Sequence, residues 1–175
     1  RPMCTGDVRS KGQGELGKDI ANLQAAMTQN GVKRGFMNAA SPGVISLFLK
    51  NDFYKSREAY LAALADAMRD EYEAIVGAGL DLPLDCPDLA LSRHMLFTDL
   101  SDAEFVKIAD SHVEALNHAL ENIPAEKVRL HICWGNYEGP HCCDIPMDTM
   151  FSTLMRAKPS YVLFETSDPR HAHEW

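Results

Sequence analysis

The sequence alternates between two apolar periodicities, and this alternation restricts the possible folds more than any other feature. Stretches in which apolar residues recur every three or four positions indicate helices, whereas short apolar runs bounded by glycine, proline or polar residues indicate buried strands. We expect strands at 3–4, 32–40, 80–85, 128–133 and 161–165, and helices at 15–29, 57–76, 101–121 and 147–156. Such alternation requires a parallel sheet with helical crossovers, so the predicted fold class is α/β.

Two architectures satisfy this expectation. An open, doubly wound sheet suits five strands, whereas a closed (β/α)8 barrel of the TIM type needs about 250 residues and this chain has 175. The periodicity alone therefore favours the open sheet. Since no internal repeat or shift in composition marks a boundary, we expect residues 1–175 to belong to one domain.

Local signals mark where several elements begin or end. Ser101 and Glu104 form the pattern of a capping box, which predicts the start of a helix. Gly77 and Gly79 follow a long helix rich in Ala and Leu and are expected to end it. The Ser-Pro-Gly segment at 41–43 is interpreted as a break between elements.

Charge and composition exclude several classes of partner. The formal net charge is −8, which would repel nucleic-acid phosphates and anionic lipids. Apolar runs stay far below the ~18 residues that a membrane-spanning helix requires, and no signal-peptide pattern opens the sequence. The five cysteines are odd in number and irregularly spaced, which favours reduced thiols over a disulfide framework. We therefore expect a cytoplasmic protein that binds neither nucleic acid nor membrane.

Polar side chains stand at the ends of three predicted strands, where a purely structural strand would not need them. They are Asp85, the pair His131 and Cys133, and Glu165. In parallel α/β folds, reactive residues gather at the carboxyl ends of strands. Residues two apart on a strand project from the same face, and imidazole, thiolate and carboxylate groups are all zinc ligands. The pattern fits a zinc site, but His-x-Cys as a bare motif is a weak signal and by itself favours buried residues that bind no metal.

Other histidines are weaker candidates. His171 and His173 are two apart beside Glu174, but they follow a proline in a predicted loop and are interpreted as surface residues. His112 and His118 are six apart on a predicted helix, which puts them on different faces. We interpret both as solvated or capping residues.

Two adjacent cysteines, Cys142 and Cys143, complete the set of candidates. In an extended chain their side chains would point to opposite sides. A shared metal ion is therefore disfavoured, and we interpret both as ordinary buried thiols.

With these residues in view, the sequence resembles the C-terminal catalytic barrel of the cobalamin-independent methionine synthase family. It is most similar to the single-barrel branch, which includes the epoxyalkane:coenzyme M transferase. The resemblance is carried by segments 4–7, 18–22, 58–68, 84–87, 131–135 and 164–165. It implies a (β/α)8 TIM-type barrel of which this chain contains about strands two to six, so that a second copy of the chain is one possible means of completing it.

The resemblance also implies roles for individual residues. His131, Cys133 and Glu165 would be ligands of Zn2+, and Asp85 would be the catalytic-site carboxylate that contacts the amino group of the thiol substrate. Two departures from the family pattern stand out. Cys86 replaces an acidic residue that usually follows Asp85, and the cysteine that the family supplies as fourth ligand from its last strand has no counterpart after Glu165.

The resemblance implies a zinc-dependent enzyme that transfers a methyl or alkyl group to a thiol acceptor. The default substrates are homocysteine and a methylated folate, as in methionine biosynthesis, so the expected partners are a small-molecule thiol and a methyl or alkyl donor. Three alternatives remain open: a zinc-dependent transferase or lyase of the coenzyme M type, a non-catalytic partial barrel, and a related metal-free barrel such as a decarboxylase in which Asp85 acts alone.

Overall fold

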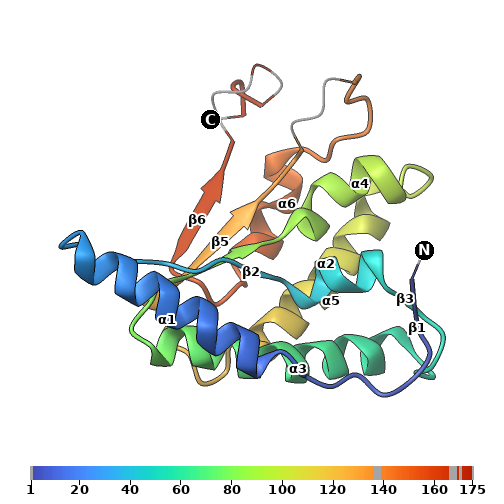
Figure 1. Ribbon diagram of the computed structural model, residues 1–175. Coiled ribbons are helices and arrows are strands. Elements are labelled where there is room, and N and C mark those ends of the chain that lie inside the picture. Colours follow the sequence, from blue (N-terminus) through green and yellow to red (C-terminus); the bar gives the residue numbers. More distant parts are fainter. Residues whose placement is uncertain (1, 136–138, 166–168, 170, 175) are drawn as a thin grey trace.

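A parallel sheet forms the centre of the molecule in a computed structural model that describes residues 2–135, 139–165, 169 and 171–174. Its four strands run in the order β2-β4-β5-β6 (Figure 1). Their bounds are Ala39–Ala40 for β2, Leu82–Asp85 for β4, Val128–Ile132 for β5 and Tyr161–Phe164 for β6. The predicted α/β class with parallel strands is therefore confirmed.

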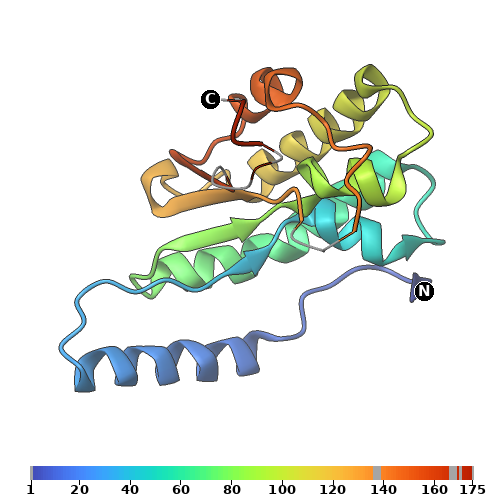
Figure 2. The ribbon, with the colours of Figure 1, turned by 90° about the horizontal axis from the view of Figure 1, so that it is seen from above.

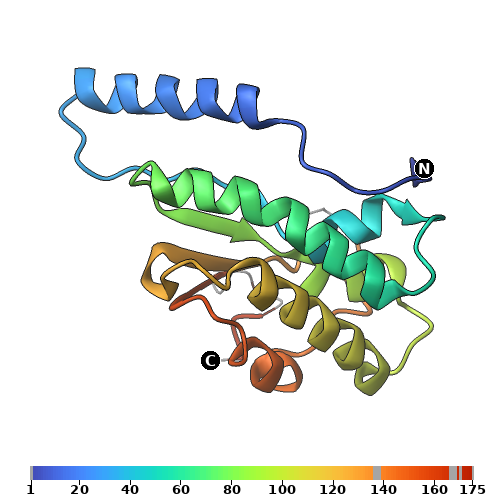
Figure 3. The same cartoon turned by 90° about the horizontal axis from the view of Figure 1, so that it is seen from below.

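The strands follow one another in chain order, and helices cover one face of the sheet. Figure 3 shows three of these helices side by side: α3 (Arg57–Gly77), α5 (Asp102–Ala119) and α6 (Met147–Leu154). Alternate residues of β4 and β5 point into this layer and are fully buried, as Leu84 and Leu130 illustrate. Because β-strand side chains alternate between faces, the intervening residues lie on the opposite face.

That opposite face is hollowed. A cavity of about 1060 Å³ is lined by Asp85, Arg129, His131 and Leu163 from the strands, together with Phe48 and other apolar residues. In the part of the chain that the structure describes, the sheet is not closed into a barrel, because β2 and β6 form its two edges. Within the described residues, no helix combines the length and the apolar character needed to cross a lipid bilayer.

The N-terminal part departs from the predicted order. β1 (Met3–Cys4) pairs in parallel with β3 (Lys50–Asn51) in a separate two-stranded sheet, so the predicted strand at 3–4 does not join the central sheet. The apolar run at 32–40 forms a strand only at its end, in β2. Periodicity identifies extended segments, but it carries no information on which strand each one pairs with.

The predicted break at 41–43 is confirmed, since β2 ends at Ala40, but the short helix that begins directly after it, α2 (Pro42–Phe48), was not predicted. The Ser41 hydroxyl accepts a hydrogen bond from the backbone N–H of Val44, and proline occupies the first turn. Both are favourable at a helix start. The predicted capping box is confirmed, since the Ser101 backbone N–H donates to Glu104 Oε2 at 2.9 Å.

The remaining elements are short, apart from one peripheral helix. Helix α1 (Gln13–Gln29) matches the prediction and lies along the margin of the molecule, on the side away from α6 (Figure 2). Its apolar stripe packs against the core next to α3. Helix α4 (Leu91–Leu96) and the 3-10 turns η1 (Pro87–Leu89) and η2 (Ala125–Lys127) were not predicted.

A buried polar network joins α2, η1, α5 and α3. The Ser41 hydroxyl donates to Asp88 Oδ1 at 2.6 Å, and His112 Nδ1 lies 2.9 Å from Asp88 Oδ2. Arg57 Nη2 lies 2.6 Å from His112 Nε2. Since a guanidinium group can only donate, Nε2 accepts and Nδ1–H donates to Asp88. The interpretation of His112 as solvated or capping is therefore wrong, whereas His118 is a surface residue hydrogen-bonded to Asp66.

Candidate metal centre

The polar residues at the carboxyl ends of β4, β5 and β6 lie together at the same end of the sheet. Asp85 is the last residue of β4, and it lies directly opposite His131 of β5 in the parallel register. Cys133 follows the end of β5, and Glu165 follows the end of β6. The predicted convergence of these residues is observed: one ligand atom each from His131, Cys133 and Glu165 lies within 4.8 Å of the other two.

Carboxylates hold the imidazole of His131 from both sides. Its Nδ1 lies 2.6 Å from Asp85 Oδ1, and its Nε2 lies 2.8 Å from Glu165 Oε1. A carboxylate on one ring nitrogen fixes the orientation of a histidine and directs the other nitrogen to a metal. Asp85 therefore contacts the predicted ligand His131 itself. Its side chain is 56% exposed, which leaves it accessible from the adjoining cavity.

The donor set fits a zinc ion. Tetrahedral zinc with bonds of about 2.0–2.3 Å holds its donor atoms about 3.3–3.8 Å apart. The donor atoms of the three residues lie within 4.8 Å of one another, so small side-chain movements are enough to reach this geometry. The hydrogen bond between His131 and Glu165 would be replaced by two bonds to the cation, and the nitrogen and oxygen atoms would separate by about 0.5–0.7 Å.

The electrostatics of the site favour a bound cation. Burial lowers the pKa of His131, but hydrogen bonds to Glu165 and Asp85 outweigh it, so the pKa of the imidazole lies above its ordinary value. Burial raises the pKa of the Cys133 thiol, the backbone N–H of Gly135 opposes this, and the two carboxylates raise it further. Without a cation, the thiol is thus protonated at neutral pH, and a divalent ion would replace protons on both ligands.

Space for a small molecule exists on both sides of the β6 end. The cavity on the open face, which Asp85 and His131 help to line, falls in the size range of ligand pockets. A second cavity of about 310 Å³ lies on the α6 side and is lined by apolar residues and by Glu165. Cys86 is fully buried and its Sγ lies 3.8 Å from the Leu84 carbonyl oxygen, so this residue belongs to the core.

The interpretation of His171 as a surface residue is wrong. It is 8% exposed, its Nε2 lies 3.3 Å from Asp144 Oδ2, and its ring packs on Trp134 with 5.0 Å between centroids. His173 is exposed, as predicted. Its Nδ1 also lies 3.2 Å from Oε2 of the nearby Glu174, but Asp144 and Trp134 come from the segment before α6, so the sequence near His171 does not indicate its burial.

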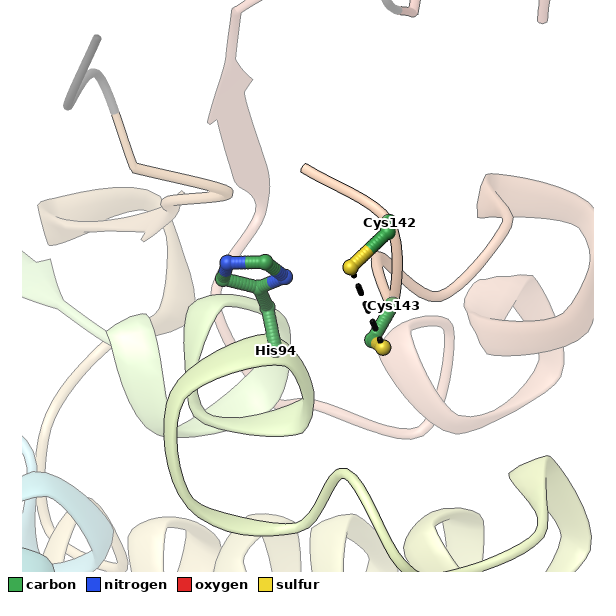
Figure 4. Close-up of side chains that lie close together, drawn as sticks. All are labelled: His94, Cys142 and Cys143. Atoms are coloured by element: carbon green, nitrogen blue, oxygen red, sulfur yellow. Dashed lines mark hydrogen bonds between the residues drawn. The ribbon is translucent and has the colours of Figure 1, made fainter. Parts of the chain in front are cut away.

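The interpretation of Cys142 and Cys143 also fails. Cys142 is exposed and Cys143 half-buried, and their Sγ atoms are 3.7 Å apart rather than on opposite sides of the chain. A ring nitrogen of His94 lies within 4.8 Å of both sulfurs (Figure 4). Sequence reasoning missed this group because His94 belongs to the unpredicted helix α4. The adjacency of Cys142 and Cys143 was the feature of the sequence that could have indicated this group.

Comparison of the chain with protein-family models, with curated proteins and with solved structures finds no match.

Proposed function

We propose that this chain binds one Zn2+ through His131, Cys133 and Glu165 and supports zinc-dependent transfer of a methyl or alkyl group to a thiol. The observation that carries the proposal is the convergence of these three donor atoms at adjacent strand ends. When bound, zinc would lower the pKa of the acceptor thiol and hold it as a nucleophilic thiolate.

Each of the residues at this site would have a distinct role towards the zinc ion. Asp85 orients His131 through Nδ1, so that Nε2 faces the ion. Cys133 and Glu165 each bring one negative charge, which balances the two positive charges of the cation. A zinc centre with no net charge withdraws less electron density from the substrate sulfur than a cationic centre does, so the sulfur would remain reactive towards an alkyl carbon.

The architecture supports a β/α barrel that is incomplete in this chain. In doubly wound sheets the strand order reverses at a switch point and helices cover both faces. Here the central strands keep chain order and α3, α5 and α6 cover one face. The edge strand β6 also exposes Tyr161, Val162 and Leu163 by 37–50%. Further strands, including those of a second copy of the chain, would cover this edge.

Homocysteine with a methylated folate is the proposed substrate pair, by resemblance to the cobalamin-independent methionine synthases. Asp85 supports an amino-bearing thiol, since its half-exposed carboxylate faces the open cavity. A thiol of the coenzyme M type carries an anionic group and no ammonium group, so it would lack this attraction to Asp85. Homocysteine is therefore favoured over a coenzyme M-type acceptor.

Zinc content and proton release test the proposal together. His131→Ala and Cys133→Ser should each lower bound zinc by about one ion per chain. Adding homocysteine to the zinc-loaded protein near neutral pH should release about one proton per chain, because the thiol binds as thiolate. Methionine, which has the same amino acid backbone but no thiol, is the matched control and should release none.

A non-catalytic partial barrel is the second candidate, and the exposure of the site favours it. The side chains of Asp85 and Glu165 are 56% and 43% exposed, whereas group-transfer sites usually exclude water. This candidate predicts that homocysteine releases no proton, and absence of zinc from the purified chain would favour it. Unchanged zinc content in His131→Ala and Cys133→Ser would refute the zinc enzyme, whereas proton release on addition of homocysteine would refute the partial barrel.

A further inference from the structure

A second group of soft ligands lies on the loop that leads into α6. Figure 4 shows Cys142 and Cys143 facing His94, which comes from α4. One ligand atom from each of the three residues lies within 4.8 Å of the others. We propose that His94, Cys142 and Cys143 form a second metal site, for Zn2+ or a similarly thiophilic divalent cation, that fastens the 139–145 loop to α4.

The separation of the two sulfurs matches thiolate coordination to one ion. Two thiolates bound to tetrahedral zinc at about 2.3 Å lie about 3.8 Å apart. The Sγ atoms of Cys142 and Cys143 are 3.7 Å apart, so both can bind without moving relative to each other. A hydrogen bond between two thiols has a similar sulfur–sulfur distance, so the metal proposal depends on the third donor, the imidazole of His94.

Buried polar side chains hold the loop in this conformation. Asp144 follows Cys143, and its carboxylate lies 2.9 Å from His141 Nδ1 and 3.3 Å from His171 Nε2. The ring of His141 stacks on that of His94 with 4.9 Å between centroids and 11° between planes. The side chains of these four polar residues are 2–11% exposed. Asp144 thus holds His141 in place, and the stacked ring of His141 restricts the orientation of the proposed ligand His94.

The donor types define the class of ion. Two thiolates and an imidazole favour zinc, cadmium and related soft or borderline cations, whereas magnesium and calcium require oxygen ligands. A Cys2His set leaves one tetrahedral position for water or another ligand.

The site would brace the first centre through the backbone. The N–H of Leu91, the first residue of α4, donates to the carbonyl oxygen of Cys133 at 2.9 Å. On the loop that carries the two cysteines, the carbonyl oxygen of Ile145 accepts a hydrogen bond from Trp134 Nε1 at 2.9 Å. A metal ion that joins His94 to the cysteines would therefore tie together two segments that each contact the end of β5. The binding proposal itself does not depend on the proposed activity.

Cadmium titration of the reduced full chain, followed by thiolate-to-metal absorption in the ultraviolet, tests the second site. The first-site variant, His131→Ala with Cys133→Ser, should still bind about one cadmium with thiolate absorption. The second-site variant, Cys142→Ser with Cys143→Ser, should lose one cadmium relative to the unmodified chain. Cys4→Ser, which removes a thiol of the N-terminal strand, should bind as the unmodified chain does. A first-site variant that binds no cadmium would overturn the second site.

A measurement on the unmodified protein removes any dependence on how the variants fold. At alkaline pH, where the free thiols ionise, zinc should slow alkylation of Cys142 and Cys143 by iodoacetamide about tenfold, since a thiolate that shares its electron pair with a cation is a poorer nucleophile than a free thiolate. Peptide mass spectrometry reads each cysteine separately, so loss of protection at Cys133 alone reports on the first centre. Equal alkylation rates of Cys142 and Cys143 with and without zinc would overturn the proposal.

Discussion

Replacement of Asp85 tests whether this residue positions His131. Asp85→Ala removes the acceptor that lies 2.6 Å from Nδ1, whereas Asp85→Asn keeps an oxygen acceptor and removes the charge. Loss of an outer partner of a metal-bound histidine typically weakens metal binding 10–100-fold. Because the side chains of Asp85 and His131 are 56% and 32% exposed, solvent screens the pair and we expect the lower end of this range.

The expected loss in Asp85→Ala is therefore about tenfold in zinc affinity, or about 1.4 kcal/mol. Asp85→Asn should lose less, since its amide oxygen still accepts from Nδ1–H.

The assay is competition for zinc with a chromophoric chelator, in a Cys142→Ser, Cys143→Ser background so that the first centre alone reports. Asp19→Ala, which removes an exposed carboxylate from α1, is the control for the change in net charge and should leave the affinity unchanged. Zinc affinities of Asp85→Ala and Asp19→Ala that agree within twofold would refute the positioning role.

Three further predictions concern pH and buried charges. The pKa of His131 lies above its ordinary 6.5, so zinc must displace a proton at low pH and its affinity, measured by calorimetric titration, should rise from about pH 6 to about pH 8. In the metal-free chain, the stability that charged His131 provides is complete below the pKa of the unfolded state and is lost as the pH rises through the pKa of the folded state. A zinc affinity that does not change with pH would contradict this prediction. Asp81→Asn should lower the free energy of unfolding in urea by about 2 kcal/mol, because the Asp81 carboxylate is 3% exposed and pairs with Arg34 at 2.7 Å and Arg129 at 3.1 Å. A loss under about 0.5 kcal/mol would show that solvent replaces these partners. His112→Ala should lower the free energy of unfolding by about 3 kcal/mol, because the buried Asp88 carboxylate loses its histidine partner. A melting midpoint within about 2 °C of that of the unmodified protein, measured by calorimetry, would disprove this prediction.

The strand ends and their convergence could be predicted because they depend on local patterns and on one topological rule. Apolar runs locate β4, β5 and β6, and parallel strands bring their carboxyl ends to one edge of the sheet. Because successive strands of β/α units usually lie side by side, Asp85, His131 and Glu165 were expected to be neighbours once the strands were identified. The two-residue spacing likewise places Cys133 on the side of His131.

The burial of His112 was predictable in principle and was missed. Phe105, Ala109, His112 and Leu116 recur at spacings of four and three along α5, and all are buried. The histidine continues the apolar face of the helix. Polarity alone suggested a solvated residue, but position on the helix determines the environment and the partners Asp88 and Arg57 satisfy both ring nitrogens.

The second cluster and the N-terminal pairing could not be predicted in this way. His94 lies almost fifty residues before Cys142, and their proximity depends on how α4 packs against the loop. The pairing of β1 with β3 likewise depends on tertiary contacts, because both are two residues long. Short strands carry too little periodicity to specify their neighbours.

Helix α1 is attached less firmly than the rest of the molecule. All of its residues are described, and none of them is fully buried; half-buried side chains such as Leu16 and Leu23 hold it against the core. Elements with few buried contacts open locally at a small fraction of the global unfolding free energy. The amide protons of α1 will therefore exchange with solvent well before those of β4 and β5, and the helix can open locally while the strand ends that carry the proposed zinc ligands stay intact.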